Sequence, residues 1–215
     1  MTHAPRAARP SAVARSMSLP EFDARLVNRL LEAIERDVLP LTEAGVAAGN
    51  KVFGAALLDK GSLETVLAET NAERSSPLRH GETHLLERYH ALPAGARPAP
   101  AELLFVSTHE PCSLCLSAIT WSGFNNFFYL FSHADSRDAF AIPHDLRILS
   151  EVFGREDYRR ENAFWSAHAI RELAASLDAV AARDAAARIE TLERRYAALS
   201  ARYQRAKADN AIPLP

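Results

Sequence analysis

Three side chains that bind zinc well lie in two short motifs of this 215-residue chain. His80 stands in His80-Gly81-Glu82, and Cys112 and Cys115 form a Cys-x-x-Cys pair further along. One imidazole and two thiolates provide three of the four ligands of tetrahedral zinc and leave one position open. An open position is what a catalytic zinc ion needs in order to activate water. The sequence therefore predicts a zinc site made of His80, Cys112 and Cys115.

Glu82 follows the histidine by two residues, which places its carboxylate beside the predicted metal rather than on it. Such a carboxylate can take a proton from water and return it to a reacting group, so Glu82 is our candidate catalytic residue. A closed structural zinc site would need a fourth protein ligand, and a thioredoxin-like redox pair would not need Glu82. His84 does not fit a His-Glu-x-x-His zinc motif, and we interpret it as a packed or pocket-edge histidine.

Both motifs resemble those of the cytidine-deaminase-like superfamily, in its nucleobase, guanine and tRNA-adenosine deaminase branch. Residues 71–82 are similar to a substrate-contacting Asn, a short loop and His-x-Glu. Residues 110–121 are similar to the Glu-Pro-Cys-x-x-Cys-x-x-Ala-Ile-x-Trp run of guanine deaminases, and His-Gly-Glu also resembles fungal-type cytosine deaminase. The likeness extends over roughly residues 20–155. It implies an α/β fold, a three-layer α/β/α sandwich with a mixed central sheet.

The resemblance also implies a reaction. A zinc-dependent hydrolase of this kind replaces an exocyclic amine of a nucleobase or nucleoside with oxygen and releases ammonia. The expected substrate is a small molecule of the guanine or cytosine type, and the expected cofactor is Zn²⁺. Two alternatives stay open, namely a tRNA adenosine-to-inosine deaminase and a non-catalytic zinc-stabilised binding module.

Further residues are expected near the substrate. The amide of Asn71 can both donate to and accept from a nucleobase edge, although Asn is also a common turn residue. In the family the first hairpin ends near the substrate, and Gly54 and Ala55 stand at that place here. Trp121 is expected either to pack in the core or to line the pocket. The remaining candidates for substrate binding are Thr108, Glu110, Asp138 and Phe140.

The chain departs from its guanine-deaminase relatives after the strand expected at residues 126–131. Those enzymes carry an acidic pair just after a Gly-Phe, whereas this chain has Ala-Phe-Ala-Ile-Pro-His-Asp over residues 139–145. Loops that follow strands are where α/β folds place substrate contacts. Four side chains are candidates for a replacement contact: His133, Asp135, Asp138 and Asp145.

Composition narrows the class of protein. Apolar residues make up 48% of the chain and charged residues 24%, as in an ordinary globular domain. The net charge of −2 argues against nucleic acid as a partner, because nucleic-acid-binding surfaces are usually basic. No apolar run approaches the roughly 18 residues of a membrane span. Both cysteines lie in one Cys-x-x-Cys, which suits a reducing cytoplasm. We expect a cytoplasmic homodimer without membrane contact.

The chain is expected to divide into three parts. Residues 1–17 are rich in Ala, Arg and Pro without acidic residues, which predicts a disordered tail, with a transit peptide as the alternative. A zinc-dependent deaminase domain is expected over residues 18–160. Residues 161–215 are expected to form a C-terminal helical extension, because apolar residues at 3-4 spacing predict one long helix over 161–206. That helix should pack on its own domain or on a second subunit.

Short sequence signals place the elements that must position the site. Ser18 and Glu21 can cap a helix reciprocally, which predicts a helix start at Ser18. Pro40 is expected to break or kink that helix. Another helix should begin at the cysteine pair, where the positive end of the helix lowers a thiol pKa. The other expected elements are strands over 51–59, 63–70, 102–107 and 126–131, a helix over 80–92 and a loop over 133–140.

Overall fold

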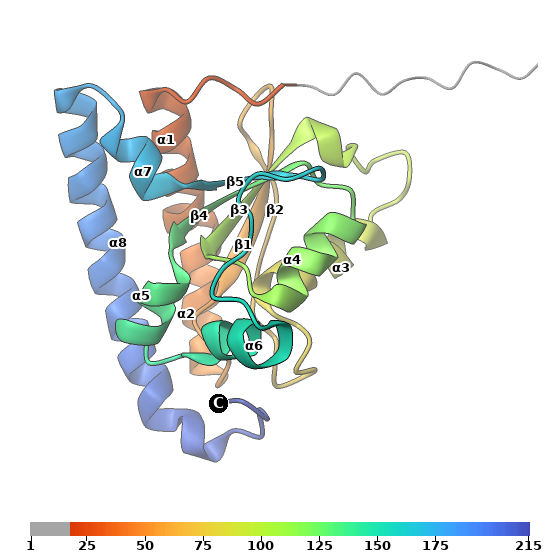
Figure 1. Cartoon of the computed structure of the whole chain (residues 1–215), viewed down its shortest axis with the longest axis vertical. Coiled ribbons are helices and arrows are strands. Elements are labelled where there is room, and N and C mark those ends of the chain that lie inside the picture. The colour runs from red at the N-terminus through yellow and green to blue at the C-terminus, as the bar shows by residue number, and fades with distance from the viewer. Residues whose placement is uncertain (1–17) are drawn as a thin grey trace, which may run out of the picture.

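A mixed sheet forms the centre of the computed structural model, which describes residues 18–215 (Figure 1). The strand order is β2-β1-β3-β4-β5, with β1 antiparallel to both of its neighbours and β3, β4 and β5 mutually parallel. The predicted mixed sheet is therefore confirmed. The tail expected over residues 1–17 lies outside the described residues. The strands are β1 (Gly54–Asp59), β2 (Thr65–Thr70), β3 (Leu103–His109), β4 (Asn126–Phe131) and β5 (Ser166–Ala169).

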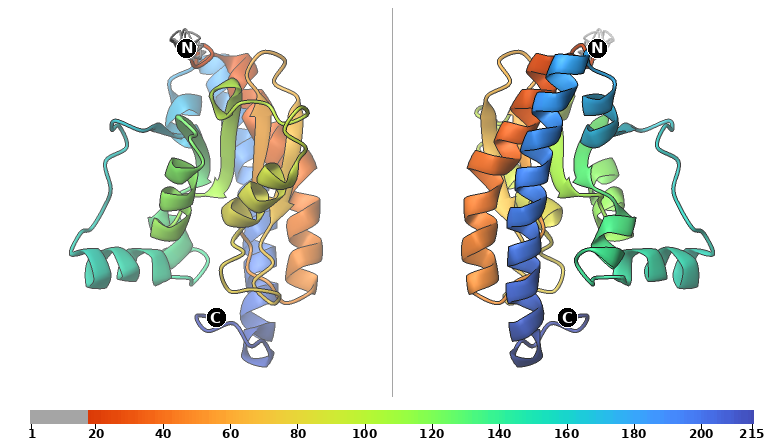
Figure 2. Two further views of the ribbon diagram at one scale, coloured as in Figure 1. Left: turned by 90° about the vertical axis from the view of Figure 1, so that its right-hand side faces the viewer. Right: turned by 90° about the vertical axis from the view of Figure 1, so that its left-hand side faces the viewer.

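Helices cover both faces of the sheet, which gives the expected three layers. Figure 2 shows α1, α2 and α8 side by side on one face, with α3 and α4 on the other. The helices on the first face, which also include α7, are α1 (Ala24–Glu32), α2 (Leu39–Ala47), α7 (Ile170–Ala175) and α8 (Ala179–Ala206). The second group is α3 (Gly81–Ala91) and α4 (Ser113–Trp121).

Alternation along the strands explains the two apolar layers. In β3, Leu104 and Val106 join the core under α1, α2 and α8, whereas Leu103 and Phe105 join the core under α3 and α4. Successive side chains of a strand point to opposite faces, so a strand buried on both sides is apolar throughout. The central strand thus carries the chain from the middle of the core directly to the cysteine motif.

The first helix begins later than expected. Asp23, not Ser18, is its cap, and the Asp23 carboxylate accepts a 2.8 Å hydrogen bond from the backbone N–H of Leu26. The expected interruption near Pro40 is a π-helical segment, Ala33–Val38, after which α2 begins. Pro40 lies in the first turn of α2, where its missing N–H needs no helical partner.

The loop expected over 133–140 is wrong, because a short helix, α5 (His133–Asp138), follows β4. Ser132 and Asp135 cap it reciprocally: the Ser132 hydroxyl accepts from the Asp135 N–H, and the Asp135 carboxylate accepts from the Ser132 N–H. Helix α6 (His144–Phe153) comes next and ends at Gly154, whose φ of 62° is left-handed. Two 3-10 turns complete the elements: Pro100–Glu102 and Lys207–Asp209.

The prediction of a single long helix over 161–206 is also wrong. This part of the chain contributes β5 to the sheet, then α7, and only then α8, which the side chain of Asp178 caps. The expected apolar stripe is confirmed for α8, which packs on α1 and α2 of the same chain. Arg188 and Arg195 add ion pairs of 2.7 and 2.8 Å to Glu35 and Glu43. The buried stripe is Ile189, Leu192, Tyr196, Leu199 and Tyr203.

Within residues 18–215, no helix is both long enough and apolar enough to cross a membrane.

Candidate functional site

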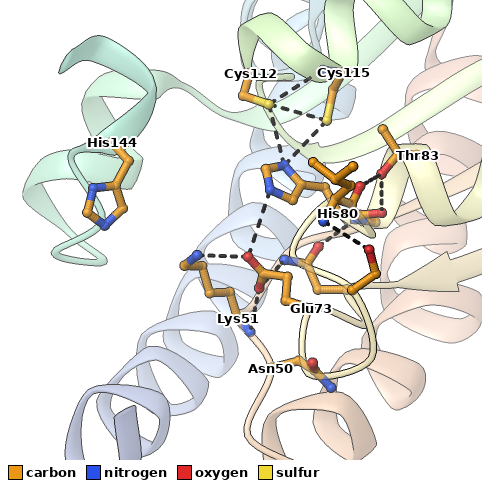
Figure 3. Close-up of polar contacts among 12 residues, drawn as sticks. Asn50, Lys51, Glu73, His80, Thr83, Cys112, Cys115 and His144 are labelled. Carbon is orange, nitrogen blue, oxygen red and sulfur yellow. Dashed lines mark hydrogen bonds and ion pairs between the residues drawn. The ribbon is translucent and has the colours of Figure 1, made fainter. Parts of the chain in front are cut away.

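The structure brings the three expected zinc ligands together at the starts of two helices. His80 caps α3, Cys112 caps α4, and Cys115 lies in the first turn of α4. The two sulfur atoms are 3.4 Å apart, and Nδ1 of His80 lies 3.4 Å from Cys112 Sγ and 3.6 Å from Cys115 Sγ (Figure 3). Among the described residues, this is the group of metal-binding side chains whose ligand atoms all lie within 4.8 Å of one another.

Electrostatics around the triad favour a thiolate. The Cys115 thiol donates to Cys112 Sγ, and this bond, with the charge of His80, holds the pKa of Cys112 well below its usual range despite burial. Burial alone would lower the pKa of His80, but the hydrogen bond and negative charge of Cys112 raise it to about 9. The thiolate is the form of cysteine that binds metal, so the site is prepared for a cation.

Glu82 lies in the first turn of α3, with its side chain buried beside the triad. Its Oε1 accepts a 2.7 Å hydrogen bond from the Ser107 hydroxyl, and its Oε2 lies 3.3 Å from Cys115 Sγ. Burial, aided by the negative charge of Cys112, raises the pKa of Glu82, and the Ser107 hydrogen bond only partly opposes this. The protonated form of this carboxyl group is therefore favoured more than that of an exposed glutamate.

Two glycines allow close packing at the start of β1, because Gly81 lets α3 approach β1 and Gly54 lets β1 approach the π-helical segment. A Cβ placed on Gly81 would lie 2.5 Å from the Cα of Gly54, and one on Gly54 would lie 2.5 Å from Val38 Cγ1. The space that Gly54 frees is filled by protein, and contact of Gly54 or Ala55 with a substrate stays a prediction. Ala55 is fully buried on the face of β1 that α3 and α4 cover, and neither residue lines the cavities described below.

Asn71 is buried behind the zinc ligands rather than in the cavity lining. Its amide oxygen accepts a hydrogen bond from the N–H of Gly81, and its Nδ2 donates to Glu73 Oε2 at 2.8 Å. The side chain thus fixes the start of α3, which carries His80. Contact between Asn71 and a substrate stays a prediction.

Thr108 and Glu110 also bind protein groups. The Thr108 hydroxyl accepts a 3.0 Å hydrogen bond from the Gly54 N–H, and Thr108 is fully buried. The Glu110 carboxylate accepts from the His133 N–H at 2.9 Å and from the Tyr158 hydroxyl at 2.7 Å. Glu110 borders the inner cavity, whereas Thr108 holds β1 against β3 and lines neither cavity.

Both expectations for Trp121 are wrong for the single chain. The side chain is 91% exposed, so it neither packs in the core nor lines a cavity around the triad. The reason is its place on α4, whose buried face carries Cys115, Leu116 and Ile119 and turns Trp121 toward solvent.

Asp138 and Phe140 are likewise outside the site. The Asp138 side chain is exposed at the end of α5 and pairs with its neighbour Arg137 at 2.6 Å. Phe140 is buried in the core, with its ring centroid 5.0 Å from that of Phe131 in an edge-to-face contact. Both were proposed on the assumption that residues 133–140 form a loop, and α5 redirects their side chains.

Two adjoining cavities surround the triad. An inner chamber of about 10 Å³ lies directly against it and has room for about one water molecule. An outer cavity of about 260 Å³ shares Phe53, His80, Cys112 and Asp145 with the chamber. The inner chamber is lined by Phe53, His80, Glu82, His109, Glu110, Cys112, Cys115 and Asp145.

Asp145 is the one of the four candidates for a replacement contact that lines these cavities. His133 binds Glu110 and the carbonyl of Pro111 instead, and Asp135 caps α5. Burial, and then the negative charge of Cys112, raises the pKa of Asp145 to about 7. Asp145 borders both cavities, which leaves its carboxyl group available to a ligand.

Residues 31–131 match the family model of the cytidine and deoxycytidylate deaminase zinc-binding region. This match identifies residues 31–131 as a zinc-binding region of the cytidine and deoxycytidylate deaminase kind. The matched region contains His80, Glu82, Cys112 and Cys115, and it ends where β4 ends. No curated protein matches the chain.

Solved structures of deaminases resemble the chain at low identity. Guanine deaminase from Nitrosomonas europaea is 22% identical, with 92% of this chain and 98% of that chain covered and a TM-score of 0.46. Guanine deaminase from Bacillus subtilis is 24% identical, with 61% and 80% covered and a TM-score of 0.43. A structure from a study of tRNA:A34 deaminases is 21% identical, with 44% and 71% covered and a TM-score of 0.37.

Zinc is the cofactor of this deaminase region, and the donor set of the chain fits it. Thiolate sulfur and imidazole nitrogen are the ligands that zinc prefers, and three of them leave a position for water. Glu82 is not among the side chains whose ligand atoms all lie within 4.8 Å of one another, so the set holds three protein ligands.

Most of the residues that line the outer cavity were not among the candidates predicted from the sequence. Phe53 immediately precedes β1, Glu73 follows β2 and His109 ends β3, so their positions near the expected strand ends and the motif were a usable signal. The residues after β4 reach the cavity through the path of α6, for which the sequence offers no comparable signal. The outer-cavity residues outside the sequence-derived candidates are Lys51, Phe53, Glu73, Pro77, Leu78, Ser113, Leu114, Ile142, His144, Ile148, Ile212, Pro213 and Leu214.

Proposed function

We propose that this zinc deaminase acts on a small nucleobase or nucleoside of the guanine or cytosine type. The observation that carries the proposal is the buried Glu82 carboxyl, which lies with the three metal ligands in one small chamber beside a larger cavity. The outer cavity of about 260 Å³ is close to the lower end of the roughly 300–1,000 Å³ range of ligand pockets, which suits a single heterocycle.

The reaction exchanges an exocyclic amine for oxygen. A zinc ion held by His80, Cys112 and Cys115 would supply Lewis acidity that makes water a nucleophile at neutral pH. Glu82 accepts the proton that the attacking water loses and delivers it to the ring nitrogen of the substrate. It then carries the second proton of that water to the departing amine, which leaves as ammonia. The raised pKa of Glu82 suits a group that must do both.

We assign recognition of the substrate to Asp145. Its carboxyl group borders both cavities and accepts hydrogen bonds when ionised, so it suits a ring N–H or an amino group. The apolar lining around it, including Phe53, Ile142 and Ile148, suits the faces of an aromatic ring. Asp145→Asn should therefore raise KM for the best substrate, while Asp138→Asn, an exposed control, should not.

Ammonia release from a panel of substrates tests the proposal. The panel contains cytosine, cytidine, guanine, guanosine, adenine and related amino-heterocycles, with zinc-loaded Glu82→Gln protein as the blank. Turnover of one small molecule, absent from the Glu82→Gln protein, is the expected result. Turnover of a tRNA alone, with binding that weakens steeply as salt rises, would replace the small-molecule assignment by tRNA editing. Binding without any turnover would indicate a zinc-stabilised binding module.

The homodimer expected from the sequence also belongs to this proposal. Trp121 is a large side chain that is 91% exposed in the single chain, and aromatic residues are enriched in protein interfaces. The mass of the protein in solution, compared with that of Trp121→Glu, tests the expectation. A wild-type protein with the mass of a single chain would contradict it.

A further inference from the structure

A buried carboxylate lies behind the zinc ligand His80. The Glu73 side chain is 1% exposed, and its Oε1 is 3.8 Å from Nε2 of His80, on the side of the imidazole that faces away from the cysteines (Figure 3). This distance is longer than a hydrogen bond but within the range in which the two groups attract each other electrostatically. Glu73 lies within the motif block of residues 71–82, but it was not among the site residues predicted from the sequence.

Other donors hold Glu73 firmly in this place. Its Oε1 accepts a 2.8 Å hydrogen bond from Lys51 Nζ, and its Oε2 accepts from Asn71 Nδ2 at 2.8 Å and from the Lys51 N–H at 3.3 Å. Lys51 is itself buried, so the pair is shielded from water. A carboxylate with these fixed partners has a defined position relative to the imidazole.

The geometry of His80 indicates a function for the Glu73 carboxylate. Nδ1 faces both sulfur atoms, so Nδ1 is the nitrogen that must offer its lone pair to the metal. A neutral imidazole that ligates through Nδ1 carries its proton on Nε2, which is the nitrogen beside Glu73. A carboxylate next to that N–H favours the ligating tautomer and attracts the positive charge that the ring gains when it binds a cation.

We propose that Glu73 is a positioning residue for His80, selecting the tautomer and orientation in which the imidazole binds zinc. The inference rests on the zinc site proposed above. Lys51 has the opposite effect in this arrangement, because its ammonium group draws on the same oxygen, Oε1, that faces His80. The two members of this buried ion pair therefore act on zinc binding in opposite directions.

This opposition separates positioning from a merely structural role. If the ion pair only held the local backbone in place, Glu73→Gln and Lys51→Met would weaken zinc binding alike. If Glu73 positions His80, Glu73→Gln should weaken zinc binding about 10–100-fold, the range found for outer partners of metal ligands. Lys51→Met should bind zinc as tightly as wild type or more tightly, because the freed carboxylate can then turn fully to His80.

The experiment measures zinc affinity by competition with a chelator at fixed pH, for wild type, Glu73→Gln, Lys51→Met and the double variant. Glu87→Gln, which removes an exposed carboxylate that pairs with Arg79, is the matched control and should bind like wild type. Nitrogen-15 NMR of the His80 ring in zinc-free protein at about pH 10, above the His80 pKa of about 9, gives a second readout, because Glu73→Gln should reduce the fraction of the neutral ring with its proton on Nε2. Unchanged affinity in Glu73→Gln, or equal losses in the two single variants, would overturn the inference.

The double variant keeps the test decisive if Lys51→Met fails to fold. It removes the charges of Lys51 and Glu73 together, so neither residue is left as an unpaired buried charge. It should lose as much zinc affinity as Glu73→Gln, and wild-type affinity in it would overturn the inference. Failure of the zinc site itself looks different, because wild type would then bind no zinc or Cys112→Ser would bind it normally.

Discussion

The hydroxyl of Ser107 donates a 2.7 Å hydrogen bond to Oε1 of Glu82, and this bond joins the central strand to the helix that carries the zinc ligand. Both residues are buried. The bond holds one carboxylate oxygen away from the triad and leaves the other facing it. The arrangement is what a proton carrier needs, because a carboxylate that bound the metal would close the position that water must take.

Glu82→Gln should therefore retain zinc and fold but lose at least about 10³-fold in kcat, since general acid–base catalysis is worth roughly 10²–10⁴-fold and Glu82 serves several steps. The amide can still accept from Ser107 but cannot carry a proton. Zinc content by metal analysis, circular dichroism and the rate of ammonia release check the three parts of this expectation.

Two outcomes would contradict it in different ways. Near-normal turnover in zinc-loaded Glu82→Gln would show that another group moves the protons. Loss of zinc from that variant would show that Glu82 is a ligand, and the interpretation of an open fourth coordination position would then be wrong.

The zinc centre was predictable because its residues lie in two short motifs. His80 and Cys112 each cap a helix, so local spacing places His80, Glu82 and Cys115 within one turn of a helix start. No knowledge of the tertiary fold is needed for that. Glu73 and Asp145 could not be assigned in the same way, because they meet the triad only through the paths of a loop and of α6.

The C-terminal third of the chain shows why hydrophobic periodicity predicted the wrong secondary structure. Strand β5 has the sequence Ser-Ala-His-Ala, which lacks the β-branched residues that favour strands. Its pairing with β4, rather than its own residues, makes it a strand. The apolar spacing that begins at Ile170 is helical, and it was extended over a segment that belongs to the sheet. By contrast, Ser132 and Asp135 form a capping box that the sequence displays, and it could have indicated α5.

Gly81→Ala should destabilise the protein by about 1–3 kcal/mol, the usual cost of forcing an extra methyl group into a packed interior. The added Cβ would lie 2.5 Å from the Cα of Gly54, which is backbone and cannot turn aside. Gly95→Ala is the matched control, because a Cβ there meets nothing within 4 Å. Urea unfolding of both variants measures the difference. Equal stability of the two would mean that β1 and α3 are not in such close contact.

Leu192→Ala should cost about 2–5 kcal/mol, the range for removing a buried leucine side chain. Leu192 is 1% exposed on the face of α8 that packs on α1 and α2, so α8 is part of the core and not an appendage. Val180→Ala, at a position on the same helix that is 64% exposed, should change stability by less than about 0.5 kcal/mol. Thermal unfolding compares them. A small effect of Leu192→Ala would indicate that α8 can be removed without loss of the fold.

The stability of the zinc-free protein should fall as pH rises from about 4 to about 7, in part because of Asp145. Burial and the negative charge of Cys112 raise its pKa from 3.8 to about 7, while His80 and Lys51 act in the opposite direction. The folded chain therefore keeps this proton over a pH range in which the unfolded chain has lost it. Stability from the protonated carboxyl is complete below about pH 4 and is lost as pH passes 7.

Asp145→Asn should remove this part of the pH dependence, because an amide does not titrate. The variant should gain about 1–3 kcal/mol relative to wild type between pH 4 and pH 8, which is less than the full value of a three-unit shift because the site is partly open to solvent. Urea unfolding of both zinc-free proteins at pH 5, 6, 7 and 8 measures the difference. Parallel pH profiles would show that Asp145 is ionised at neutral pH in the folded chain, and its carboxylate would then be charged when a substrate arrives.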